Sequence, residues 1–125
     1  MSKLRKESGY CAPYALKYLT GLPDKKILDA CRANGFKQEW GMEEYEVINA
    51  AYDLGLRTRR VNLKKRDLYG IKLLRFTKEY PQGRFLVYTP GHILVVSNGV
   101  IVDPINDGYI GEERAVTAAW KVNNG

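Results

Sequence analysis

The sequence is poor in the residues that hold metals and disulfides, with two cysteines, Cys11 and Cys31, and a single histidine, His92. Two cysteines cannot build a disulfide scaffold, and no cysteine or histidine cluster has zinc-ligand spacing, so we expect no metal and no cofactor. No apolar run approaches the ~18 residues that a membrane helix needs, and no signal-peptide segment follows the first residues. We therefore expect a cytoplasmic protein without a membrane partner.

Acidic residues are also fewer than basic ones, 14 against 20, which gives a formal net charge of +6. A basic patch attracts nucleic acid or an acidic partner, so association with nucleic acid is one candidate function. No recognition motif accompanies these charges, and we favour a solvated basic surface. Besides the N-terminal residues, the charges come from Arg57, Arg59, Arg60, Lys64, Lys65 and Arg66.

Apolar spacing and turn residues predict one domain over residues 1–125, with helices first and a mostly antiparallel β-sheet after them, which is the α+β class. In the first helix Pro13 is tolerated only in the first turn, so Cys11 lies at the helix N-terminus. The last helix is expected to bury Leu73, Leu74 and Thr77. The predicted helices span about 11–20, 23–34, 42–54 and 68–80, and the predicted strands 56–63, 84–89, 92–97, 100–103 and 115–122.

The clearest hairpin signal surrounds Asn98-Gly99, the dipeptide that best tolerates positive φ at both central positions of a type I′ turn. A two-residue turn fixes the register, which places His92 and Asp103 on one face of the sheet as diagonal neighbours, with backbones roughly 7–8 Å apart. We therefore predict that Asp103 orients the imidazole of His92. Asn106 or Asp107 could do so if the turn is of another type.

These residues suit nucleophilic catalysis by a thiol. A helix N-terminus stabilises a thiolate at Cys11, and His92 could accept the thiol proton and later deliver one to a leaving amine. Asp103 would hold the tautomer of the imidazole and stabilise the imidazolium. The alternatives are structural: Cys11 could be a small core residue, and His92 with Asp103 a buried pair. Cys31 falls in the apolar stripe of the second helix and is predicted to be a core residue.

The pattern resembles the papain-like cysteine peptidases, in particular the compact peptidase C39-like domains and related small phage and bacterial proteins. The resemblance implies a papain-like fold, with N-terminal helices packed on the sheet, and a peptidase or related amide or thioester hydrolase that acts on a peptide or protein substrate. It implies Cys11 as nucleophile, His92 as base and Asp103 as orienting acid. The matching stretches are Cys11 to Leu16 with Thr20-Gly21, Gly41 to Leu56, Tyr80 to Val87, and Gly91 to Pro104.

Two positions depart from the papain-like pattern. The glutamine that these enzymes place six residues before the cysteine, as an oxyanion donor, is Arg5 here, and the glycine common after the cysteine in C39-like domains is Ala12. The Ser8 hydroxyl or a backbone N–H could supply the missing donor. The alternative is a catalytically weak or inactive papain-like module that holds a peptide or protein partner in the former substrate groove.

Overall fold

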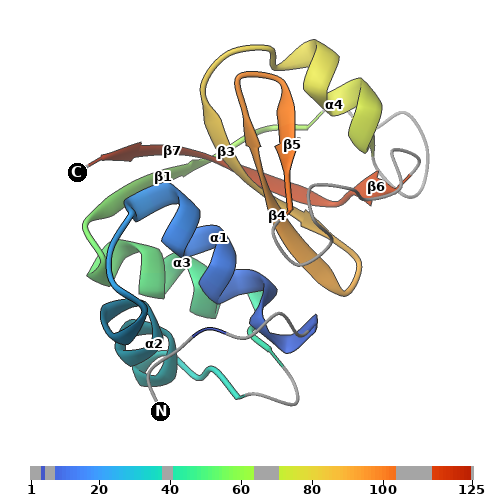
Figure 1. Ribbon diagram of the computed structural model, residues 1–125. Coiled ribbons are helices and arrows are strands. Elements are labelled where there is room, and N and C mark those ends of the chain that lie inside the picture. The colour runs from blue at the N-terminus through green and yellow to red at the C-terminus, as the bar shows by residue number, and fades with distance from the viewer. Residues whose placement is uncertain (1–3, 5–7, 38–40, 64–70, 104–113, 125) are drawn as a thin grey trace.

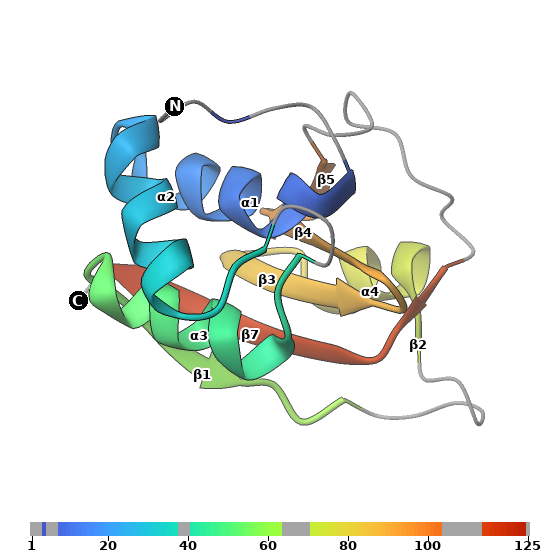
Figure 2. The ribbon, with the colours of Figure 1, turned by 90° about the horizontal axis from the view of Figure 1, so that it is seen from below.

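The computed structural model describes residues 4, 8–37, 41–63, 71–103 and 114–124 of the chain. Three helices lie on one face of a five-stranded antiparallel sheet and a fourth lies on the other face (Figure 1). Seen from below, α1, α2 and α3 are in front of the sheet and α4 is behind it (Figure 2). The α+β class predicted from the sequence is confirmed.

The first three helices are close to their predicted bounds. A 3-10 turn, η1 (Ser8–Tyr10), leads into α1 (Cys11–Thr20), which is followed by α2 (Asp24–Ala33) and α3 (Glu44–Asp53). Gly21 ends α1 in the left-handed conformation, with φ 70°, where a side chain would be strained. Cys11 is therefore the first residue of α1, as Pro13 in the first turn predicts.

The strands form one large and one small sheet. The large sheet has the order β1 (Leu56–Arg60), β7 (Ala118–Asn124), β3 (Arg84–Thr89), β4 (His92–Ser97) and β5 (Val100–Val102). The small sheet pairs β2 (Ile71–Lys72) with β6 (Ala115–Val116). Every strand pair between the described residues is antiparallel.

The chain between β1 and β3 differs from the helix predicted over residues 68–80. Residues 71 and 72 form β2, because β6 pairs with them, and α4 spans only Leu73–Glu79. Leu74 was expected to be buried but is exposed, whereas Phe76 is buried and Leu73 and Thr77 are buried as predicted. The predicted strand over 56–63 ends at Arg60. The single strand predicted over 115–122 is divided into β6, which belongs to the small sheet, and β7, which belongs to the large sheet and continues to Asn124.

Apolar side chains separate into two clusters, one on each face of the sheet. The helix-side cluster joins Leu16, Val47 and Ile93, among others, and the α4-side cluster joins Phe76 and Leu94 with their neighbours. Because side chains alternate along β4, neighbouring residues of this strand face different clusters. The strand that begins at His92 therefore contacts both layers of the fold.

Candidate active site

Two tight turns determine where His92 and Asp103 lie. The Pro90-Gly91 turn joins β3 to β4, with Gly91 at φ 75°, and it makes His92 the first residue of β4. The Asn98-Gly99 turn joins β4 to β5 with φ angles of 49° and 77°, as a type I′ turn requires, and the predicted register is confirmed. Asp103 directly follows β5.

The predicted contact between His92 and Asp103 is present. Nε2 of His92 lies 2.7 Å from Oδ2 of Asp103, and their side chains are only 8% and 1% exposed. A carboxylate at this distance accepts a hydrogen bond from Nε2–H, so the neutral ring carries its proton on Nε2. Nδ1 is then the nitrogen that remains to accept a proton from another group.

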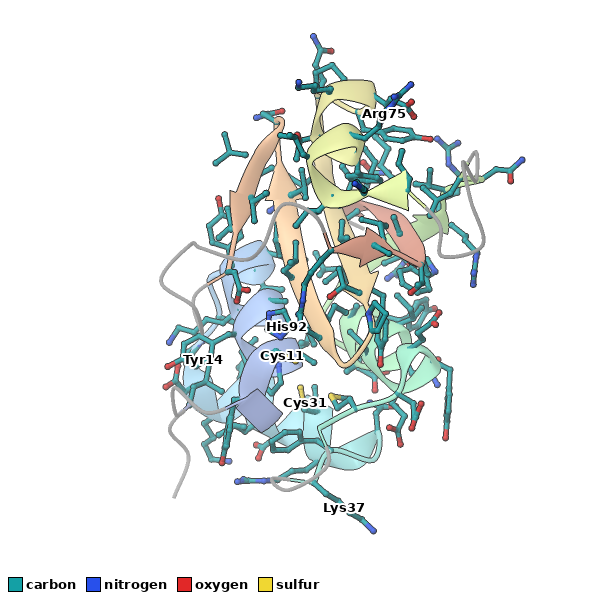
Figure 3. All side chains as sticks on the ribbon, turned by 90° about the vertical axis from the view of Figure 1, so that its right-hand side faces the viewer. Cys11, Tyr14, Cys31, Lys37, Arg75 and His92 are labelled. Carbon is teal, nitrogen blue, oxygen red and sulfur yellow. The ribbon has the colours of Figure 1, made fainter. Side chains whose placement is uncertain are left out.

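Cys11 lies against the start of β4, where the N-terminal end of α1 meets the sheet. The backbone N–H of Ile93, the residue after His92, hydrogen-bonds to the sulfur, and the Asp103 carboxylate acts on it electrostatically. In the view of Figure 3, the labelled Cys11 and His92 project onto the same region, where the N-terminal end of α1 meets the sheet. Cys11 is half-buried, whereas Cys31 is fully buried in the helix-side cluster, as predicted. The fold therefore brings together Cys11, His92 and Asp103.

The electrostatics of the thiol differ from the sequence-based expectation. Burial raises the pKa of Cys11 above its ordinary value of 9.0, and the Asp103 carboxylate raises it further. Backbone N–H groups of Ile93, Ala12 and Cys11 itself lower the pKa, as expected at a helix N-terminus, but burial outweighs them. The thiol is therefore protonated at neutral pH and needs a base to become a nucleophile.

Tyr88 is a further residue near the thiol that sequence patterns do not single out. It is opposite Ile93 in the β3–β4 register and packs against the helix-side cluster, as Cys11 does. Burial raises the pKa of the Tyr88 phenol, and the negative charges of Glu43 and the Cys11 thiolate contribute. The sequence signal for Tyr88 is the tight Pro90-Gly91 turn. A two-residue turn fixes the register of β3 against β4 and so places Tyr88 opposite Ile93.

Several predicted residues have no described side chain. Ser8, the suggested oxyanion donor, is in η1, but its side chain lies outside the described part of the chain. Arg5, which stands where papain-like enzymes have glutamine, also lies outside the described residues. The same holds for Asn106 and Asp107, the alternative partners of His92, and for Lys64, Lys65 and Arg66 of the basic stretch.

Within residues 8–37, 41–63, 71–103 and 114–124, no group of three histidine, cysteine or carboxylate residues is placed to hold a metal ion. Among the helices that the structure describes, each is too short or too polar to cross a membrane.

Comparisons of the chain with protein families, with curated proteins and with solved structures found no match.

Proposed function

We propose that the protein is a cysteine-dependent hydrolase that acts on an amide or thioester carbonyl of a peptide or protein substrate. Cys11 is the nucleophile, His92 the general base and acid, and Asp103 the residue that orients His92. The observation that carries this proposal is the buried contact between Nε2 of His92 and Oδ2 of Asp103, beside the thiol at the N-terminus of α1.

The proposed reaction begins with proton transfer from Sγ of Cys11 to Nδ1 of His92, because the thiol is protonated at neutral pH. Sγ then attacks the carbonyl carbon, and the imidazolium returns its proton to the leaving amine or thiol as the bond to the carbonyl breaks. Water next attacks the resulting thioester while His92 accepts its proton. The acid product leaves, and Cys11 recovers its thiol proton from His92.

The role of His92 can be tested by labelling the two thiols of the folded protein with iodoacetamide and reading each site by peptide mass spectrometry. Cys11 should label faster than Cys31, but exposure alone explains that difference. The informative variant is His92→Ala, which should slow labelling of Cys11 by roughly 100-fold if a positioned base is lost. Labelling in 6 M urea provides the control, because His92→Ala should have no effect there. An unchanged Cys11 rate in the folded variant would exclude the proposed role.

The raised thiol pKa favours a second candidate, a binding module of the same architecture that holds a peptide or protein without cleaving it. This candidate predicts slow reaction of Cys11 with peptidyl vinyl sulfones in the wild-type protein. It also predicts that a peptide selected from a random library for binding to the wild-type protein binds the Cys11→Ser variant with the same affinity. Rapid, His92-dependent reaction with the vinyl sulfones would exclude it.

The cytoplasmic location stays a prediction, which microscopy of the tagged chain would test.

A further inference from the structure

A cavity of about 510 Å³ lies on the face of the sheet opposite the thiol. It is bordered by the end of β1, by Asn62 and by the chain that leaves α4, including Tyr80. Tyr80 and Phe85 on its wall belong to the α4-side cluster, whereas Cys11 packs against the helix-side cluster. The cavity is therefore separate from the candidate active site.

One row of the sheet supplies the cationic side chains of this cavity. Arg59 of β1 pairs with Lys121 of β7, and Lys121 pairs with Phe85 of β3, so the three side chains are on one face in one line. All three border the cavity. The end of the Lys121 side chain lies close to the backbone of Gly83. A Cβ added to Gly83 would be 3.3 Å from Cε of Lys121 and 3.9 Å from its Nζ.

Like charges directly opposite each other on neighbouring strands repel. Among the described residues, no carboxylate forms an ion pair with Arg59 or Lys121. Glu79 also borders the cavity, but its carboxylate is 3.2 Å from Nε of Arg75. An anion between Arg59 and Lys121 would relieve their repulsion.

The other arginines of β1 are engaged elsewhere. The guanidinium of Arg57 lies 4.2 Å above the Tyr52 ring. Arg60 borders the cavity, but its guanidinium lies 5.4 Å from the Trp120 ring and 3.8 Å from a Glu44 oxygen. Arg59 and Lys121 therefore differ from Arg57 and Arg60, whose guanidinium groups already contact other side chains of the protein. A variant of Arg57 removes one positive charge from the same strand and serves as the control for variants of Arg59.

An aromatic wall stands beside this cation pair. Tyr80 packs on Phe76 and Phe85 at ring-centroid distances of 4.7 and 5.6 Å, which hold it at the edge of the cavity. Proteins usually recognise the nucleotides of a single strand with two components. Cationic side chains contact the phosphate, and a neighbouring aromatic ring stacks on the base. We propose that this cavity binds a nucleotide unit, with its phosphate between Arg59 and Lys121 and its base against Tyr80.

The nucleotide can come from a free mononucleotide or from a single strand, and two probes separate these sources. One is fluorescein-labelled dT10, followed by fluorescence anisotropy from 50 to 200 mM NaCl, and the other is AMP, followed by the shift in melting temperature. We expect dT10 binding in the wild-type protein, and at least a tenfold loss of affinity in Arg59→Gln/Lys121→Gln. The slope of log affinity against log salt should fall by about 0.7 in that variant, because the one phosphate held between the two cations is no longer neutralised.

Three comparisons decide the outcome. Arg57→Gln should change dT10 affinity less than twofold, and Cys11→Ser should leave it unchanged, since the cavity is independent of the thiol. Tyr80→Leu should weaken binding in a folded protein, as judged by its melting curve, whereas Tyr80→Phe should not. Equal losses in Arg57→Gln and Arg59→Gln, equal affinity for a polyglutamate peptide, or no binding of either probe would each overturn the proposal. A melting shift with AMP alone would assign the site to mononucleotides.

Discussion

Asp103 holds His92 by a 2.7 Å contact between Oδ2 and Nε2 that is almost completely shielded from solvent. The two residues are joined by one continuous hairpin, so their geometry depends on a single tight turn rather than on distant packing. Cys11, in contrast, comes from the opposite end of the sequence and reaches β4 only through the packing of α1. The orientation of the base and the approach of the nucleophile are therefore separable by mutation.

Replacing Asp103 tests how much the buried contact stabilises the fold. Asp103→Ala should lower the free energy of unfolding by about 1–3 kcal/mol, because a buried imidazole loses its acceptor. Asp103→Asn keeps an oxygen acceptor for Nε2–H and should lose less than half as much. Urea denaturation of both variants measures the difference, and equal losses would show that charge, rather than the hydrogen bond, stabilises the pair.

The pH dependence of Cys11 labelling follows from its raised pKa. Because burial raises the pKa above 9.0, the thiolate fraction, and with it the iodoacetamide rate, should still be rising at pH 9 in His92→Ala. In the double variant His92→Ala/Asp103→Asn, the midpoint of the labelling rate against pH should move to lower pH. The reason is that the negative charge of Asp103 no longer opposes formation of the Cys11 thiolate. A rate that levels off below pH 8 in His92→Ala would contradict the buried environment.

Cys31 should make the protein sensitive to alkali. Burial raises its pKa to about 12, so between pH 9 and 12 the folded chain keeps a proton that the unfolded chain loses. The stabilisation is fully present below pH 9 and falls by about 1.4 kcal/mol per pH unit above it. Chemical denaturation at several pH values should show that the stability difference between wild type and Cys31→Ala shrinks above pH 9. A constant difference would argue against a protonated buried thiol.

The turn that sets the register can be tested at Gly99. Its φ of 77° is unfavourable for any residue with a Cβ, and a Cβ there would lie 3.4 Å from the backbone oxygen of Thr77. Gly99→Ala should therefore lower the free energy of unfolding by about 1–2 kcal/mol. Val100→Ala is the neighbouring control, since Val100 is 61% exposed and should change stability by less than about 0.5 kcal/mol. Thermal denaturation of both variants provides the measurement.

Local signals were sufficient for the parts of the fold that one segment determines. Pro13 and Gly21 limit α1 to the correct residues, and Asn98-Gly99 determines the hairpin register and hence the contact of His92 with Asp103. Each of these positions restricts the backbone by its own chemistry, so no distant partner is needed to predict it.

Other features could not be read from the sequence because partners far along the chain determine them. Residues 71 and 72 form a strand only because β6 pairs with them, and local apolar spacing favoured a helix there. The balance of effects on the Cys11 thiol likewise depends on burial by β4 and on the Asp103 carboxylate. The row from Arg59 through Lys121 to Phe85 combines three strands whose order no local pattern reveals.

The position of β7 between β1 and β3 also has a consequence for biosynthesis. Until residues 118–124 have left the ribosome, β1 lacks its only strand partner in the described structure, and β3 has an open hydrogen-bonding edge. Such edges pair readily with other chains, and pairing over this sequence distance is slow. A nascent chain that already has β3, β4 and β5 but not yet β7 is therefore open to aggregation until residues 118–124 pair with β1 and β3.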